Sequence, residues 1–229
     1  MAEGLSHPFS LAYALGVAAL FHLLRREWQI ARERAEAAMT LSTEQGFPFW
    51  LAYGALGRGS ALAEQGQVAE GIAQIQQGLT AFRTMGTNPP GIGHLPVLAA
   101  AYAKAGQVEE GLGIVADALE AVDKTGGRVN EAELYRLKGE LTLAQSSVQS
   151  LESRVKEAEE CFHKAIEIAR NQQAKSLELR AVMSLSRLWQ GQGKKDEAWQ
   201  MLAEIYGWFT EGFDTKDLQE AKMLLEELT

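Results

Sequence analysis

This sequence is short of cysteine, of proline and of basic residues. Its single cysteine, Cys161, means that no internal disulfide can form and that no zinc site can be built from cysteines. That scarcity fits a reducing, cytoplasmic compartment. The five prolines leave long stretches free to be helical. The 22 basic residues against 30 acidic ones give a net charge of -8, which argues against nucleic acid and against an anionic membrane surface as partners.

Long hydrophobic runs are also missing. The most apolar run, residues 9–24, has about 16 residues, whereas a helix needs about 20 to cross a bilayer. No basic residue precedes this run, as a signal peptide would require. We therefore expect no membrane segment and interpret the run as a buried first helix.

An internal repeat with a period of 40 residues organises the chain. The segment QGQVAEG at 65–71 recurs as AGQVEEG at 105–111. One position of the repeat holds a small residue in every unit. It is Ala31, Gly71 and Gly111 at the 40-residue spacing and, after an insertion of seven residues, Ala158 and Ala198. Repeats of this length predict stacked helical hairpins.

Each repeat is predicted to form two helices. We expect one domain over 1–229, with units at 8–46, 47–86, 87–126, 127–173 and 174–213 and a capping helix at 215–228. The paired helices are expected at 8–24 and 28–45, 47–65 and 68–85, 95–105 and 108–125, 130–144 and 156–172, and 174–190 and 195–209. Six glycines stand where a helix should end in the left-handed conformation: Gly46, Gly66, Gly86, Gly106, Gly126 and Gly193.

The second helices share a face that alternates small and large residues. Gly71, Ile75 and Gly78 lie on one side of a helix, which predicts close packing of two helix backbones. The same spacing returns twice, as Gly111, Val115 and Ala118 and as Ala158, Phe162 and Ala165.

The two ends of the chain differ in character. The last helix is predicted to bury Leu218, Ala221, Leu225 and Leu228 and to expose a polar face, as the cap of a repeat array does. The first helix is apolar nearly all round. We expect that either more chain precedes it or another subunit covers it, so self-association through this helix is one hypothesis.

Four stretches carry a family resemblance: FPFWLA at 47–52, ALAEQG at 61–66, EAELYRLKGE at 131–140 and YGWFTEGFDT at 206–215. The hairpins resemble tetratricopeptide repeats. The whole chain resembles the C-terminal helical-repeat region of large bacterial regulators, which join a cyclase or DNA-binding module to a signal-transduction ATPase. This resemblance implies an all-α, right-handed α-solenoid of about five hairpins plus a cap. It also implies a sensory or scaffolding role within a longer multidomain protein.

No catalytic, cofactor-binding or metal-binding residue is predicted. Glycines at 54, 57 and 59 lack the order of residues and the preceding strand of a phosphate-binding loop, and fit helix packing instead. The four histidines have no histidine partner at helical spacing, and no base is evident for Cys161. The protein is therefore not expected to be an enzyme.

The first helices of tetratricopeptide arrays line a concave groove, and the repeat phase selects the side chains that would face it. The predicted groove residues are Tyr53, Leu56, Ser60, Glu64, Lys104, Glu133, Arg136, Glu140, Arg180, Arg187 and Gln190. Arg136, Arg180 and Arg187 would suit an acidic peptide or an anionic effector, because guanidinium groups bind carboxylates in a fork. The alternative is that these arginines pair within the chain, with Glu133, Glu140 and Glu178.

Two functions remain open. The first is an interaction module whose groove binds a peptide, a neighbouring domain or another protomer, at low ordering cost because the surface is preformed. The second is a sensor in which a small molecule changes the repeat array and thereby controls an attached ATPase or cyclase. An open groove would favour the first, and a deep enclosed pocket the second.

Overall fold

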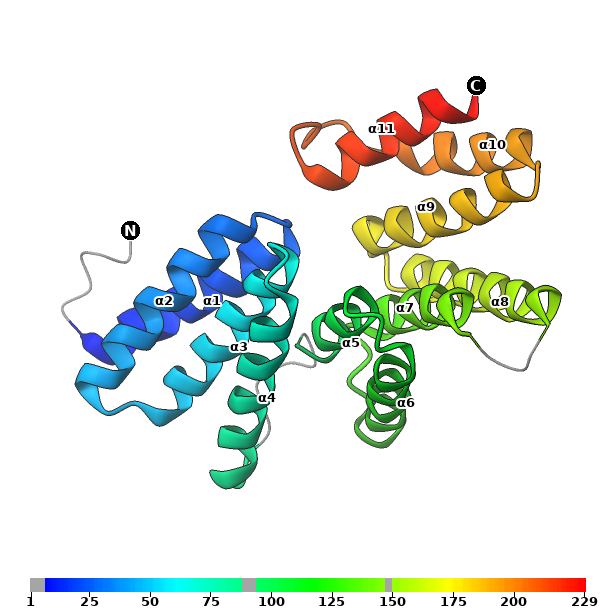
Figure 1. Ribbon diagram of the computed structural model, residues 1–229. Coiled ribbons are helices and arrows are strands. Elements are labelled where there is room, and N and C mark those ends of the chain that lie inside the picture. The colour runs from blue at the N-terminus through cyan, green and yellow to red at the C-terminus, as the bar shows by residue number, and fades with distance from the viewer. Residues whose placement is uncertain (1–6, 88–93, 147–149) are drawn as a thin grey trace. The chain divides into compact units, whose positions relative to one another are not determined.

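The computed structural model describes residues 7–87, 94–146 and 150–229, and this part of the chain forms eleven α-helices and no strand (Figure 1). The helices are α1 (Pro8–Leu24), α2 (Trp28–Gln45), α3 (Pro48–Glu64), α4 (Val68–Thr84), α5 (His94–Lys104), α6 (Val108–Thr125), α7 (Glu131–Ala144), α8 (Leu151–Asn171), α9 (Lys175–Gly191), α10 (Lys195–Tyr206) and α11 (Lys216–Leu228). The chain divides into two compact units, Met1–Gln107 and Val108–Thr229.

The predicted helices are confirmed in number and order, and most of their ends agree within a residue or two. All six predicted terminal glycines have positive φ; at Gly66, for example, φ is 91°. The second helix of the fourth repeat starts earlier than predicted, because α8 begins at Leu151 and not at about 156. Ser150 caps it by accepting a hydrogen bond from the Ser153 amide, so part of the insertion lengthens the helix. Residues 147–149 lie outside the described residues.

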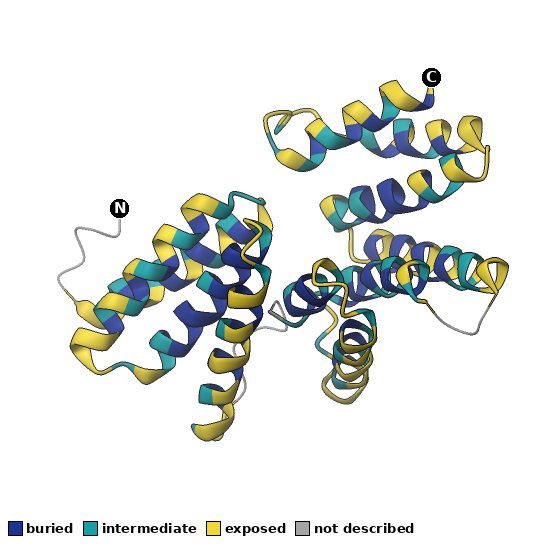
Figure 2. Cartoon of the chain, viewed as in Figure 1, coloured by how far each residue is buried: buried dark blue, intermediate teal, exposed yellow. Residues whose placement is uncertain are grey.

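In the first unit, every second helix of the chain (α1, α3 and α5) lies in one layer. Consecutive helices contact one another, and α3 also touches both α1 and α5. Twelve residues of α3 are buried, so this helix is the centre of the unit (Figure 2). The layer α1–α3–α5 is the arrangement expected of the first helices of stacked hairpins.

Glycines let the backbones of α3 and α4 approach closely. A Cβ added at Gly71 would lie 2.6 Å from the Gly59 carbonyl oxygen and 2.7 Å from the Ala63 amide nitrogen. A Cβ at Gly78 would lie 3.0 Å from the Ala52 carbonyl oxygen. The predicted small face of the second helix is therefore confirmed, and glycines of α3 serve packing.

In the second unit, α7, α9 and α11 form the corresponding layer. α9 touches both α7 and α11, while α8 and α10 pack on their neighbours in sequence and α6 packs on α7. Phe162 of α8 is buried against Gly139 of α7, where an added Cβ would lie 2.5 Å from the ring. The spacing predicted for Ala158, Phe162 and Ala165 is confirmed, since all three are buried.

The two end helices differ from their predictions in detail. The last helix buries Leu218, Ala221, Leu224 and Leu228, so Leu224 takes the core position that was predicted for Leu225. The first helix is not wholly buried, because one side of α1 is exposed. Among the described residues, no helix has both the length and the apolarity that crossing a bilayer demands.

Candidate binding surface

The candidate surface in the second unit is the polar side of the layer α7–α9–α11. Arg136 lies in the middle of α7 and donates two hydrogen bonds to Glu133. Its Nε donates to Oε2 at 2.8 Å, and its Nη2 donates to Oε1 at 2.6 Å. Its Nη1 also donates to Glu140 Oε1 at 2.5 Å. The spacings i−3 and i+4 place all three side chains on one face of the helix. This local pairing is the intramolecular alternative that the sequence left open.

Burial and neighbouring charges shift the pKa values of Glu133 and Arg136 in opposite directions. Burial by itself raises the pKa of the Glu133 carboxyl, but the neighbouring Arg136 guanidinium outweighs it and the pKa falls below its ordinary value. Burial likewise disfavours the charged form of Arg136. The Glu133 and Glu140 carboxylates reverse that effect and raise the pKa of the guanidinium. Both groups are therefore charged at neutral pH.

Hydrogen bonds and ion pairs continue from α7 across the layer. Ser184 of α9 donates its hydroxyl to Glu140 Oε1 at 2.8 Å. Arg180 of α9 pairs with Asp217 of α11, with Nη2 and Oδ2 2.6 Å apart. Arg187, two turns further along α9, lies 3.9 Å from Glu220 of α11. The predicted basic cluster is thus spread along two helices and interleaved with acidic side chains.

The three arginines differ in how accessible they are. The side chains of Arg136 and Arg180 are 15% and 19% exposed, whereas that of Arg187 is 49% exposed. Gln190, one turn after Arg187, is half-buried. Glu178, proposed above as a partner of these arginines, instead pairs with Arg170 and Lys175, each at 2.7 Å. An incoming acidic group would therefore reach Arg187 first.

The predicted groove residues of the first unit fall into two groups. Tyr53, Leu56 and Ser60 are no more than 4% exposed, so they belong to the core of this unit and present no surface. The Ser60 hydroxyl donates to the Leu56 carbonyl within α3. Glu64 of α3 and Lys104 of α5 are brought together, with Nζ and Oε2 2.6 Å apart. Tyr53, Leu56 and Ser60 were predicted to face the groove from their place in the repeat. They are core positions instead, because neighbouring helices cover α3 on several sides.

An exposed aromatic segment follows α10. Trp208 is 58% exposed and Phe213 is 47% exposed. Trp208 packs edge-on against Phe209, with ring centroids 5.2 Å apart, and the Lys175 ammonium lies 5.7 Å from its ring centre. Large exposed aromatic rings are frequent anchors of protein interfaces. The signal was available, because this segment lies in the YGWFTEGFDT stretch.

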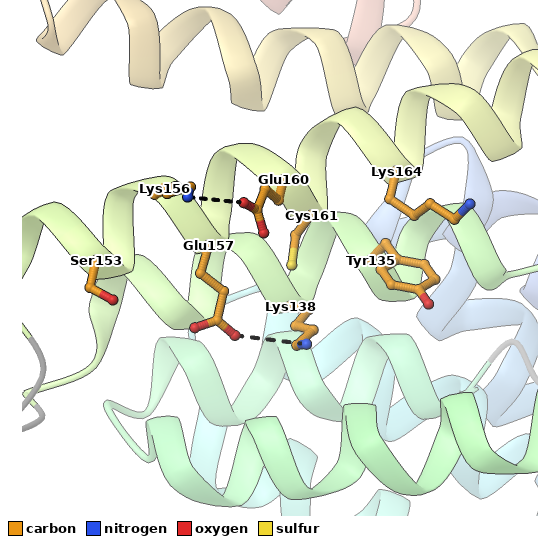
Figure 3. A pocket seen from close by; sticks show the side chains of 8 residues that line it. All are labelled: Tyr135, Lys138, Ser153, Lys156, Glu157, Glu160, Cys161 and Lys164. Atoms are coloured by element: carbon orange, nitrogen blue, oxygen red, sulfur yellow. Dashed lines mark ion pairs between the residues drawn. The ribbon is translucent and has the colours of Figure 1, made fainter.

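A polar pocket of about 510 Å³ lies between α7 and α8 (Figure 3). Its lining residues are Tyr135, Lys138, Ser153, Lys156, Glu157, Glu160, Cys161 and Lys164. Lys138 lies 3.8 Å from Glu157, and Lys156 lies 4.0 Å from Glu160. Burial raises the pKa of the Cys161 thiol, which is the opposite of what a nucleophilic cysteine needs. The pocket is open to solvent, and its three lysines pair with neighbouring glutamates.

Within the ranges that the structure describes, no group of three His, Cys, Asp or Glu side chains is placed to hold a metal ion. The Cys161 thiol is buried on α8.

Comparison with known protein families found no match, and comparison with curated proteins found none either. Solved structures do match in fold. A kinesin light chain from Podosopora anserina with nearly identical TPR-like repeats gives a TM-score of 0.58 at 18% identity, over 89% of this chain and 96% of that one. Yeast Tom70 matches with a TM-score of 0.58 at 15% identity, and the match covers 96% of this chain and 39% of Tom70. The apo form of the quorum sensor NprR from B. thuringiensis matches with a TM-score of 0.54 at 14% identity, and the match covers 98% of this chain and 72% of NprR. The chain therefore has a tetratricopeptide-like helical fold.

Proposed function

We propose that this chain is a non-enzymatic interaction module of a cytoplasmic bacterial signalling protein. The observation that carries the proposal is the polar face of α7, α9 and α11, where ion pairs hold arginines in fixed positions and Arg187 remains half exposed. A preformed surface binds with little ordering cost. The partner is a peptide, a neighbouring domain or another protomer that presents carboxylates to this face. The signalling context rests on the resemblance of four sequence stretches to the repeat regions of cyclase and ATPase regulators.

The exposed aromatic segment extends the proposed site. Lys175, which lies against Trp208, is the first residue of α9, so Trp208 is near one end of the helix that carries Arg180 and Arg187. A partner could combine a carboxylate on Arg187 with an apolar side chain against Trp208. Aromatic and arginine anchors together are the composition that dominates binding energy in many interfaces.

The test is quantitative affinity capture from a lysate of the source organism, with three baits. The wild type, Arg187→Glu and the control Arg34→Glu are compared; Arg34 is an exposed arginine on α2. We expect a protein partner to be retained by the wild type and by Arg34→Glu and to be reduced at least about tenfold with Arg187→Glu. Equal capture by all three baits would contradict this location of the site.

The pocket between α7 and α8 is the feature on which a second function would rest, although it is open to solvent and is not a deep enclosed pocket. We propose as the alternative a sensor domain, in which a small polar effector bound there alters the hairpin and controls an attached ATPase or cyclase. The three lysines on its wall pair with Glu157, Glu160 and Glu167, and an anionic effector would bind there in exchange for these carboxylates. The likeness in fold to a protein described as a quorum sensor agrees with this alternative. A thermal-shift screen of anionic metabolites tests it, with hits expected to disappear in Lys138→Ala.

A further inference from the structure

The polar face of the second unit is built from two rows of charged side chains. Each row takes an acidic residue from α7, an arginine from α9 and an acidic residue from α11, and α9 lies between the other two helices (Figure 1). The members on α7 are seven residues apart, as are those on α9, and seven residues make two helical turns, so the rows share one face. The two rows are Glu133, Arg180 and Asp217, and Glu140, Arg187 and Glu220.

The first row is closed by its own hydrogen bonds. Arg180 Nε and Nη2 both contact Asp217 Oδ2, at 2.8 and 2.6 Å, and the two side chains are only 19% and 14% exposed. The Glu133 carboxylate is held by Arg136 through two hydrogen bonds. A partner enters this row only by breaking these bonds.

The second row is open to solvent. Arg187 is 49% exposed, and its Nη2 lies 3.9 Å from Glu220 Oε2, which is longer than a hydrogen bond. Glu140 is 41% exposed although it accepts hydrogen bonds from Arg136 and Ser184. Ser184 stands one turn before Arg187 on α9, so its bond to Glu140 brings that carboxylate to the same side of α9 as Arg187. Both charges can therefore be reached by an incoming chain.

The order of charges in the open row selects against a strongly acidic partner. With Arg136, the two rows hold three arginines and four acidic side chains, so the face has no net positive charge. A run of carboxylates would meet Arg187 at its centre, but it would also meet Glu140 and Glu220 on either side, and like charges repel. A segment whose charges alternate in sign meets a complementary group at each of the three helices.

Helix packing sets the distance between the three charges. The axes of packed neighbouring helices are about 8–10 Å apart. An extended peptide advances about 3.3 Å per residue. Three residues of such a peptide therefore cover the step from one helix of the layer to the next.

We propose that the open row binds an extended peptide segment with the charge order basic–x–x–acidic–x–x–basic, where x is uncharged. The central carboxylate binds Arg187, and the two cations bind Glu140 and Glu220. The charge order is the same in both chain directions, so a peptide satisfies it in either direction. This pattern rests on the function proposed above and narrows its partner to one arrangement of charges. The net charge of -8 on the chain attracts a segment whose own net charge is positive.

Fluorescence anisotropy with labelled synthetic peptides tests the charge order on the whole chain. Low ionic strength is needed, because salt screens exposed ion pairs. The probe is KTSESTK. One comparison peptide, ETSESTE, carries acids at all three charged positions, and the other, TSKEKST, has the composition of the probe with its charges adjacent. We expect the probe to bind at least about tenfold more tightly than either comparison peptide.

Variants of the row test which side chains recognise the pattern. Arg187→Glu should weaken binding of KTSESTK at least about tenfold. Glu220→Lys makes one end of the row basic, so it should bind KTSESTE or ETSESTK more tightly than KTSESTK. Glu226→Lys is the matched control, because Glu226 is exposed on α11 and lies about 120° around the helix from Glu220. The control should keep the wild-type preference, and a far-UV circular dichroism spectrum checks that each variant is folded.

The outcomes separate the charge pattern from the location of the site. Equal binding of KTSESTK and ETSESTE by the wild type, with both lost in Arg187→Glu, overturns the pattern and leaves Arg187 as the site of the proposed function. Equal binding of KTSESTK and TSKEKST overturns the three-residue spacing. A wild type that does not bind KTSESTK up to about 1 mM also overturns the pattern. The affinity capture described above decides the proposed function separately.

Discussion

The two units hold their first helices in place by different means. In the first unit, α3 lies against its neighbours through glycines that bring backbones together, and Gly59 and Gly71 face each other directly. In the second unit, α7, α9 and α11 are joined by charged side chains around Arg136 and Arg180. The same hairpin repeat therefore tolerates either close apolar packing or a polar network. Both units also present charged side chains at the surface, such as Lys104 in the first unit and Arg187 in the second.

The largest effect is expected from filling the glycine contact of the first unit. Gly71→Ala places a methyl group against the Gly59 carbonyl oxygen, and backbone atoms on both sides cannot yield. We expect the free energy of unfolding to fall by about 2 to 3 kcal/mol, as overpacking does. Gly113→Ala in α6 is the control, because an added Cβ there meets nothing within 4 Å.

Denaturant titration followed by far-UV circular dichroism measures both glycine variants. The control should gain about 0.5 to 1 kcal/mol from the better helix propensity of alanine. Opposite signs for the two variants would establish that Gly71 is required for space. Equal gains would contradict the close approach of α3 and α4.

The next largest effect is expected from breaking the polar network of the second unit. Arg136→Met leaves the Glu133 and Glu140 carboxylates half-buried without their cation, and should cost about 2 kcal/mol of unfolding free energy. Adding Glu133→Gln and Glu140→Gln removes the unpaired charges. The triple variant should recover to within about 1 kcal/mol of the wild type. A triple variant that is as unstable as Arg136→Met would mean that the network itself, and not the unpaired charge, determines stability.

The smallest effect concerns pH. Because the pKa of Glu133 is lowered in the folded chain, its charge stabilises the fold above the ordinary glutamate pKa of about 4.3, and this stability is lost as the pH falls toward the lowered value. The difference in stability between the wild type and Glu133→Gln should be about 1 kcal/mol at neutral pH and should shrink below about pH 4.3. Unfolding measured from pH 7 to 3 checks this, with exposed Glu226→Gln expected to show no such trend.

The helices could be predicted closely from the sequence, because the period of 40 residues and the terminal glycines are local signals. The polar face could be predicted only in part. The pairing of Arg136 with Glu133 and Glu140 follows from spacing on one helix, but Arg180 and Asp217 lie on different helices and are 37 positions apart in the sequence. The prediction placed Tyr53, Leu56 and Ser60 on the groove surface, but they are buried. The position of a residue in the repeat predicts the direction of its side chain and does not predict how many neighbouring helices cover that side.

The repeat, the number and order of the helices and the glycines at which helices end could all be predicted from the amino-acid sequence. These features depend on backbone conformation and on hydrophobic periodicity within a few turns. Only the tertiary structure decided which faces remain open: α3 is enclosed while the equivalent face of α1 is bare, and Arg187 is more accessible than Arg136. Exposure depends on what packs against a helix from elsewhere in the chain, and a local pattern does not contain that information.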